Sequence, residues 1–260
     1  MNITAITTNV NGERYNQFLK NNSHLEIKSF EAILGNDLSH DEVLTQNLAT
    51  SQLISHKFFS PGAIGCGASH RAIWRNCIKE QKNFLVLEDD CYTHPKIMEF
   101  IQANKKNLDS CDICYFGLHT DSVIKLKSPE GLQFSSIYFD PPYPEPEWIR
   151  SYFYKTDIKK IIFNKLIIGF GTWAYFLTPK GARKLDDLIF PLSLKKTPIP
   201  LIDNGRTKDM PCTSIDRSAC SIYEKIDAFI TYPFLALNPN NDISTTEISH
   251  PKKISYNFQK

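Results

Sequence analysis

The stretch FLVLEDDCYTHP, residues 84–95, decides the fold, because it joins an apolar run directly to a cluster of acids. The run 84–87 consists of four apolar residues, which is typical of a strand buried on both faces. Glu88, Asp89 and Asp90 follow at once, although adjacent carboxylates repel one another. A buried strand that ends in three acids predicts that a positive charge sits at its carboxyl end.

The segments around this strand alternate between strand and helix patterns. NITAITT (2–8), LEIKSFEAI (25–33) and DICYFGL (112–118) have strand patterns, whereas ASHRAIWRNCIKEQ (68–81) and KIMEFIQANKKNL (96–108) have helical ones. This order predicts an α/β fold in which helices flank a mostly parallel, doubly wound central sheet.

The alternation breaks after residue 119. YFDPPYPEPEWIRSYFYK (138–155) contains four prolines and many aromatics, so we expect a long ordered loop that serves as a lid or a wall of a binding site. Residues 171–189 predict a strand and then a helix with Pro179 in its first turn, and 214–226 predicts a helix capped by Ser214. No convincing domain boundary is visible, so we expect a single domain over 1–260.

Composition and charge favour an ordinary globular protein. The chain has 260 residues, 42% of them hydrophobic, and a net charge of +2, which is too small to suggest a nucleic-acid binder. The N-terminus lacks signal-peptide features, and no window reaches the ~18 apolar residues of a membrane span. We therefore expect a cytoplasmic protein with at most peripheral membrane contact.

The seven cysteines fit a reducing compartment. Their number is odd and their spacing irregular, unlike a secreted disulfide framework. Cys111 and Cys114 form a CxxC pair, but the pair lies in an apolar run and has no second CxxC partner. We expect both thiols to be buried in the core rather than bound to zinc.

The acids at 88–90 fit a divalent cation. In an open parallel sheet, ligands bind beyond the carboxyl ends of the strands. Carboxylate oxygens are the ligands that Mg²⁺ and Mn²⁺ prefer, and a cation would relieve the repulsion among the three acids. The competing reading is that the acids cap the next loop and point into solvent.

A longer segment around the acids, GAIGCGASHRAIWRNCIKEQKNFLVLEDDC (62–91), resembles the hallmark of glycosyltransferase family 25. The matching residues are Gly62, Ile64, Gly65, Cys66, Ser69, His70, Trp74, Glu88, Asp89 and Asp90. The resemblance continues in order through FEAILGNDL (30–38), DICYFGL (112–118) and GTWAYFLTPKGARKL (171–185), and more weakly through 214–216 and 233–243.

The resemblance implies a Rossmann-like glycosyltransferase fold of the A type, with a nucleotide-sugar-binding half at 1–119 and an acceptor-side half at 120–260. It implies a metal-dependent, inverting transfer of a hexose, with galactose from UDP-galactose expected, onto lipooligosaccharide, lipopolysaccharide or another cell-surface glycan. Expected partners are Mn²⁺ or Mg²⁺, the UDP-sugar and a glycan or glycolipid, with no nucleic acid and peripheral contact with the inner membrane surface.

Site residues follow from the matching positions. Asp90 is the expected direct metal ligand, with Asp89 and Glu88 on metal, metal-bound water, ribose or sugar; His250 is a candidate third ligand. Arg14 is expected at a phosphate, which its guanidinium can bind bidentately. The remaining expected donor-binding residues are Thr7, Thr8, Asn9, Gly171 and Thr172.

Ser69 and His70 are expected to open a helix whose N-terminal amides favour an anion, with His70 at donor phosphate or sugar hydroxyls. An inverting reaction needs a general base, and Asp216 is our candidate, with helix capping as the competing role. Asp203, Asp187 and Glu224 remain alternatives for the base.

Aromatics and lysines in the second half leave two readings open. Tyr143, Trp148, Tyr152 and Tyr154 either stack on acceptor sugars or staple the loop to the core. Lysine pairs at 159–160, 195–196 and 252–253 either dock on anionic lipid or face solvent.

Two other functions stay open on the sequence alone. A metal-dependent nucleotidyltransferase would use the same acids, although no P-loop follows the first strand. A degenerate transferase that only binds a nucleotide sugar or glycan is the other, although its acid motif is complete.

Overall fold

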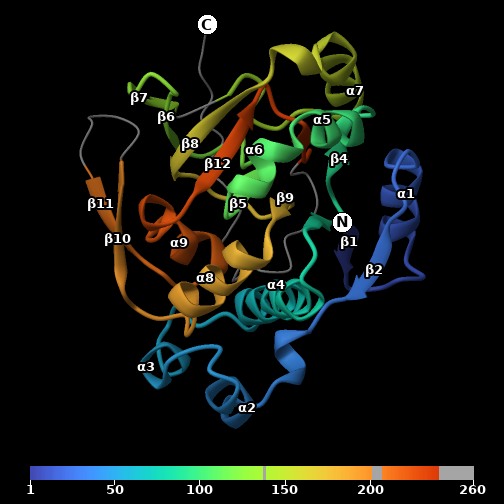
Figure 1. Ribbon diagram of the computed structural model, residues 1–260. Helices are drawn as coiled ribbons and strands as arrows, with labels where there is room; N and C mark the ends of the chain where they lie inside the picture. Colours follow the sequence, from blue (N-terminus) through green and yellow to red (C-terminus); the bar gives the residue numbers. More distant parts are fainter. Residues whose placement is uncertain (137–138, 201–206, 240–260) are drawn as a thin grey trace, which may run out of the picture.

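The structure is a computed structural model that describes residues 1–136, 139–200 and 207–239 (Figure 1). Within these residues nine strands form one sheet in the order β2-β1-β3-β9-β5-β12-β8-β6-β7. The strands are β1 (Asn2–Thr7), β2 (Lys28–Glu31), β3 (Phe84–Glu88), β5 (Ile113–Tyr115), β6 (Ile124–Lys127), β7 (Gln133–Ser136), β8 (Ile162–Ile168), β9 (Ala174–Leu177) and β12 (Ala228–Tyr232).

Helices lie on both faces of this sheet (Figure 1). They are α1 (Glu13–Asn21), α2 (His40–Thr45), α3 (Ser51–Ile54), α4 (Pro61–Glu80), α5 (Ile97–Ala103), α6 (Lys105–Ser110), α7 (Pro146–Lys155), α8 (Pro179–Ile189) and α9 (Ile215–Cys220). Short 3₁₀ turns are η1 (Gly35–Asp37), η2 (Ile158–Lys160) and η3 (Tyr223–Lys225). Two small ribbons pair β10 (Lys196–Pro200) with β11 (Thr207–Pro211) and β4 (Tyr92–Thr93) with β13 (Ala236–Leu237). The predicted α/β fold is confirmed.

The sheet is mixed in direction, rather than mostly parallel as predicted. β2, β1 and β3 run parallel, as do β5 and β12, whereas β9 lies antiparallel between β3 and β5. The far side, β12-β8-β6-β7, is antiparallel throughout. Because β9 is antiparallel to both its neighbours, β3 and β5 point the same way, and their carboxyl ends lie at one edge of the sheet.

β3 is buried on both faces, as its apolar run predicts. Phe84 and Val86 pack into the cluster that includes α4 and α8, while Leu85 and Leu87 pack into the cluster that includes α1 and α5. Successive residues of a strand point to opposite faces, so one short run supplies both cores. The strand is therefore a rigid base for the acids that follow it.

Helix α4 begins earlier than predicted, at Pro61 instead of residue 68. Ser60 caps it, with its hydroxyl accepting from the Ala63 amide at 3.3 Å. The glycines in this segment suggest a loop, but Gly65 has a packing role. A Cβ on Gly65 would lie 2.5 Å from both Gly35 N and Ile33 O, so glycine lets α4 touch the chain around η1.

The prediction of an irregular loop over 138–155 is wrong for 146–155, which forms helix α7. Pro146 stands in the first turn, where the missing amide costs no hydrogen bond. Ile149 and Phe153, four residues apart, are both buried and hold the helix to the body of the protein. Three of the four prolines precede the helix, and they do not interrupt it.

The seven cysteines are free thiols, and Cys111 and Cys114 are buried as expected. Among the described residues, no helix combines the length and the apolar character needed to cross a membrane.

Candidate active site at the end of β3

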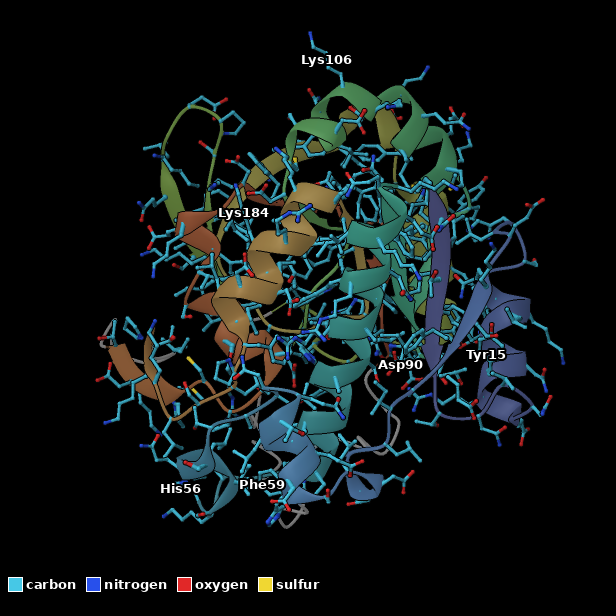
Figure 2. The ribbon with its side chains drawn as sticks, turned by 60° about the horizontal axis from the view of Figure 1, so that its bottom comes forward. Tyr15, His56, Phe59, Asp90, Lys106 and Lys184 are labelled. Atoms are coloured by element: carbon cyan, nitrogen blue, oxygen red, sulfur yellow. The ribbon has the colours of Figure 1, made fainter. Side chains whose placement is uncertain are left out.

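Two parallel strands bring the first residues of the site together. β1 pairs with β3 in the register Ile6 to Glu88, so Thr7 and Asp89 leave the sheet side by side. The Thr7 hydroxyl donates to Asp89 Oδ2 at 2.6 Å. Figure 2 labels Asp90, which follows at this end of the sheet.

Arg14 bridges the two aspartates. Its Nη2 atom lies 2.8 Å from Asp89 Oδ1 and 2.9 Å from Asp90 Oδ2. Both oxygens of Asp89 are therefore engaged, one by Thr7 and one by Arg14, and the residue is almost fully buried. Asp89 holds the site together, and Asp90 is the better placed of the two to bind a ligand.

Asp90 is incompletely paired. Its Oδ1 atom is buried and has no hydrogen-bond partner among the described residues. Burial raises the pKa of Asp90 to about 7, and the negative charge of Glu88 acts in the same direction, against Arg14 and a hydrogen bond from Asn238. A buried carboxylate oxygen without a donor is costly, so the site favours an added positive charge.

Glu88 is fixed by a chain of buried hydrogen bonds. Its Oε1 atom accepts from Thr172 Oγ1 at 2.6 Å and lies 3.3 Å from Nε2 of His70. Behind it, Trp74 Nε1 donates to the Tyr175 hydroxyl at 2.9 Å, which lies 2.8 Å from His70 Nδ1. Each donor finds an acceptor when Tyr175 donates to Nδ1 and the imidazole donates through Nε2 to Glu88.

The ionisation of Glu88 follows from this chain. Burial opposes its charge, but the hydrogen bonds from His70 and Thr172 and the nearby imidazoles of His70 and His119 more than offset burial, so its pKa is lowered. Glu88 therefore presents a fixed negative charge at the site.

Asp216 belongs to the same site. Burial raises the pKa of the Cys66 thiol well above its usual range, and the charges of Glu88, Asp216 and Asp90 raise it further, so all three carboxylates lie near this thiol. Asp216 Oδ1 accepts from Ser214 Oγ at 2.5 Å and from the Arg217 amide at 2.8 Å. Ser214 is the N-cap residue of α9, as predicted, but its hydroxyl bonds Asp216 rather than a helix amide.

Sequence reasoning missed His119, which follows β5. Its ring packs edge-on against Trp173 at 4.5 Å, and its Nδ1 lies 3.7 Å from an oxygen of Asp121. Gly171 has φ +98, and a Cβ there would lie 2.8 Å from His119 Cδ2, so glycine is required beside this imidazole. The strand-end rule that picked out the acids would also have found His119, because β5 ends at the same edge.

Asn238 was also missed: it lies in the stretch 233–243 that resembles the family weakly, but no local pattern marks the residue itself. It follows β13, whose pairing with β4 brings it back to Asp90. Only the tertiary fold places it there.

The prediction that Ser69 and His70 open a helix is wrong. α4 begins at Pro61, so both residues lie in its third turn, far from the free amides of its first turn. Ser69 is fully buried: its hydroxyl donates to Gly65 O at 2.8 Å and accepts from the Ile33 amide at 2.9 Å. Ser69 ties α4 to the chain after β2, and His70 reaches the site only through Glu88.

Thr8, Asn9 and His250 are the remaining predicted residues. Thr8 and Asn9 are exposed just after β1, and the Asn9 side chain accepts from the Asn11 amide at 3.0 Å. His250 lies outside the described residues. Within the described part of the chain, no three His, Cys, Asp or Glu side chains form a ready-made metal cluster.

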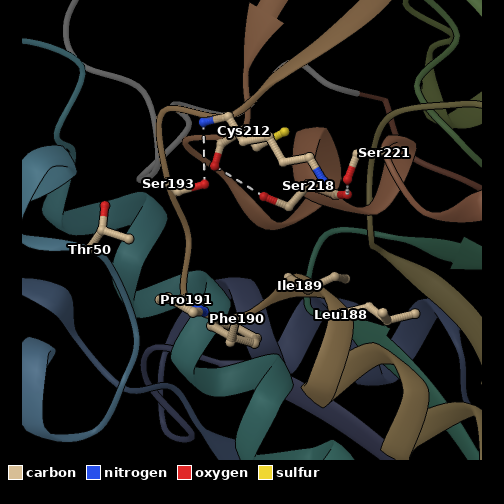
Figure 3. Close-up of a pocket in the computed structure, with 10 residues that line it drawn as sticks. Thr50, Leu188, Ile189, Phe190, Pro191, Ser193, Cys212, Ser218 and Ser221 are labelled. Carbon is tan, nitrogen blue, oxygen red and sulfur yellow. Dashed lines mark hydrogen bonds between the residues drawn. The ribbon is translucent and has the colours of Figure 1, made fainter.

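Two hollows lie away from the acids. One, of about 270 Å³, is bordered by Thr50, Phe190, Cys212 and Ser218 (Figure 3). The other, of about 390 Å³, lies along α7. Neither is lined by Glu88, Asp89 or Asp90.

One of the comparisons with known proteins shows the family of the chain. A family model described as "Glycosyltransferase family 25 (LPS biosynthesis protein)" matches residues 11–199, the stretch from α1 to β10. No curated protein matches the chain. Among solved structures, the chain is similar to "Crystal Structure of A197 from STIV" at 12% identity, over 99% of this chain and 100% of that one, with a TM-score of 0.35.

Proposed function

The chain belongs to glycosyltransferase family 25, and from this premise we propose that it transfers a hexose from a UDP-sugar onto a lipopolysaccharide or lipooligosaccharide glycan, with a divalent cation and with inversion. The family makes the chain a glycosyltransferase of lipopolysaccharide biosynthesis with a sugar donor and a glycan acceptor. The choice of UDP-galactose as donor, and a cytoplasmic place at the inner membrane surface, are parts of the proposal.

One observation carries the proposal: Asp90, at the carboxyl end of a central strand, holds a buried oxygen with no partner among the described residues. Ligands of open α/β sheets bind at this edge. Arg14 lies within 2.9 Å of the same carboxylate, and 39% of its side chain is exposed, so the guanidinium also reaches outward. A carboxylate next to an outward guanidinium suits a cation and a phosphate together.

The residues present fit Mg²⁺ or Mn²⁺. Mg²⁺ commonly binds one or two carboxylates together with substrate phosphates, so the small number of protein ligands in the described chain agrees with such an ion. Asp90 would hold it, with Asp89 behind. When bound, the cation supplies the charge that stabilises the diphosphate as the sugar leaves.

The protein's own groups have distinct proposed roles. Arg14 orients both aspartates and can pair with a donor phosphate. Glu88, held in place by Thr172 and His70, is placed to orient sugar hydroxyls. Asp216 is proposed to take the proton from the acceptor hydroxyl: its Oδ1 is held by two donors, and no hydrogen bond to Oδ2 occurs within the described residues.

Transfer assays test this function. Purified protein is incubated with UDP-galactose, UDP-glucose and UDP-N-acetyl sugars and delipidated core oligosaccharide, with Mn²⁺ or with EDTA. We expect product with at least one donor, no product in EDTA, and loss of at least ~100-fold in Asp90→Asn. Full activity of Asp90→Asn, or activity that survives chelation, would refute the metal assignment.

A further inference from the structure

The groove along α7 is not explained by the acid site. It measures about 390 Å³ and lies between α7, η2 and Pro233. α7 packs beside the segment that follows the acids, because His94, just after β4, hydrogen-bonds the Phe153 carbonyl at 3.0 Å through Nε2 (Figure 1). The groove thus lies on a helix that contacts this segment, although Glu88, Asp89 and Asp90 do not line it.

α7 presents two different faces. Ile149 and Phe153 are buried, whereas Trp148, Ser151, Tyr152 and Lys155 recur at the spacing of one helix face and line the groove. The burial of the first pair explains why the helix stays attached. Tyr152 also packs partly buried against the core, so Trp148 is the aromatic on this face that core packing does not explain.

The groove face carries a flat aromatic platform. The rings of Trp148 and Tyr152 stack at 5.3 Å with an angle of 12° between their planes. The Tyr152 hydroxyl accepts from the Phe234 amide at 2.7 Å, which fixes its position. Trp148 keeps 40% of its surface exposed. A rigid, open indole is well suited to pack on the C–H face of a sugar ring.

Positive charge borders the platform. Lys155 and Lys160 are exposed and make no ion pair within the described residues. One acid, Asp157, also lines the groove; as the cap of η2 it accepts from the Lys159 amide at 3.0 Å, and its single negative charge leaves the two lysines in excess. The two ammonium groups therefore remain available for a phosphate or carboxylate.

The groove is within reach of the acid site. Pro233 borders the groove, and Asn238, five residues later, hydrogen-bonds Asp90. Five residues span at most about 18 Å when fully extended. An oligosaccharide can therefore contact both places at once.

We propose that the α7 groove binds a negatively charged sugar unit of the acceptor, remote from the hydroxyl that reacts. The sugar ring packs on Trp148, and its phosphate or carboxylate pairs with Lys155 and Lys160. This inference rests on the proposed transferase function and adds to it the anionic character of the acceptor. Binding energy from such a remote unit helps to orient the reacting end.

Calorimetry with delipidated core oligosaccharide, phosphorylated and enzymatically dephosphorylated, tests the proposal. We expect Trp148→Ala to weaken binding of both forms at least ~10-fold. Lys155→Gln/Lys160→Gln should weaken binding of the phosphorylated form alone when a phosphate pairs with the lysines, and of both forms when a carboxylate does. Tyr154→Ala is the matched control: its side chain is on the same helix and 92% exposed but does not line the groove, so affinity should be unchanged. Trp74 and Trp173 are buried, whereas Trp148 is exposed in the groove. Oligosaccharide binding to the wild type should therefore change the fluorescence emission of Trp148.

Unchanged affinity in Trp148→Ala overturns the proposal, as does the absence of oligosaccharide binding to the wild type. Binding of anionic phospholipid vesicles through the lysines, without oligosaccharide binding, would assign the groove to a membrane surface instead. Titration of UDP with Mn²⁺ is run on the same variants and should be unaffected. A wild type that binds oligosaccharide but not UDP would contradict the proposed donor site while leaving the groove assignment standing.

Discussion

At the residue scale, the three acids at the end of β3 have different roles in the site. Asp89 is fully paired, Glu88 is fixed by Thr172 and His70, and Asp90 retains an oxygen without a partner in the described chain. Three adjacent acids thus have three environments. The residue that is least well satisfied in the fold is the one best suited to a ligand.

The Asp90 side chain should lower the unfolding free energy of the ligand-free protein. Its pKa is about 7 in the folded state, above the value of 3.8 for an unperturbed Asp, so the folded state binds the proton more tightly. The wild type therefore loses stability from this group as the pH rises from about 4 to about 7. We expect Asp90→Asn, without ligand, to become more stable than the wild type by about 1–2 kcal/mol at pH 8.

Urea unfolding of both proteins from pH 5 to pH 8 measures this difference. A gap between the two that does not grow with pH would contradict the account. Asp41→Asn, which changes an exposed aspartate on α2, serves as the control and should show no such trend.

The hydrogen-bonded chain behind Glu88 makes a second prediction. Tyr175→Phe leaves the buried Trp74 and His70 nitrogens without their shared partner, which should cost about 1–3 kcal/mol of unfolding free energy. It should also lower kcat, because Glu88 loses its support, while UDP affinity stays unchanged. Parallel urea unfolding, steady-state kinetics and UDP titration separate these effects; a normal kcat would show that the chain does not position Glu88.

At the element scale, α4 depends on glycine at one position and not at another. A Cβ at Gly65 would lie 2.5 Å from backbone atoms of Ile33 and Gly35, whereas at Gly67 the nearest atoms are side-chain carbons at 3.5 Å. We expect Gly65→Ala to destabilise the fold by about 1–3 kcal/mol. Gly67→Ala should be neutral or stabilise by up to about 1 kcal/mol through helix propensity. Thermal unfolding of both variants decides it, and equal effects would contradict the packing argument.

The elements also show what sequence can predict. The apolar run 84–87 and the spacing of apolar residues in α4 and α8 carry a local pattern, so their type was predictable. The antiparallel direction of β9 was not, because AYFL is apolar throughout and has no feature that encodes orientation. The helical form of α7 was not predicted, because four prolines indicate an irregular segment, whereas Pro146 occupies the first turn, where proline is tolerated.

At the scale of the whole molecule, one buried arginine joins three segments. Arg71 in α4 bonds Asp186 in α8 and donates to the carbonyls of Gln46 and Asn47 at 2.7 and 2.9 Å. Arg71→Ala should destabilise the protein by about 3–5 kcal/mol, since it leaves buried groups unpaired. Arg75→Ala, which removes the exposed partner of the same aspartate, should cost at most about 1 kcal/mol. Similar losses of unfolding free energy in Arg71→Ala and Arg75→Ala, measured by urea unfolding, would contradict the role of Arg71 in joining these three segments.

The site is assembled from distant parts, which limits what the sequence alone reveals. Glu88, Asp89 and Asp90 were predictable because they follow a recognisable strand, and Arg14 because it resembles the family pattern. Asn238 and the groove along α7 depend on how β13 pairs with β4 and how α7 packs. Such contacts have no local signal in the chain.

The most direct test of the account is calorimetric titration of UDP into the protein with Mn²⁺, with EDTA, and in Asp90→Asn, with Asp41→Asn as control. With Mn²⁺ present, we predict that UDP binds to the wild type and to Asp41→Asn but not to Asp90→Asn. With EDTA, we predict that UDP binds to none of the three proteins. UDP binding that survives both chelation and the loss of Asp90, or no binding under any condition, would contradict the proposal that a cation at Asp90 holds the donor diphosphate.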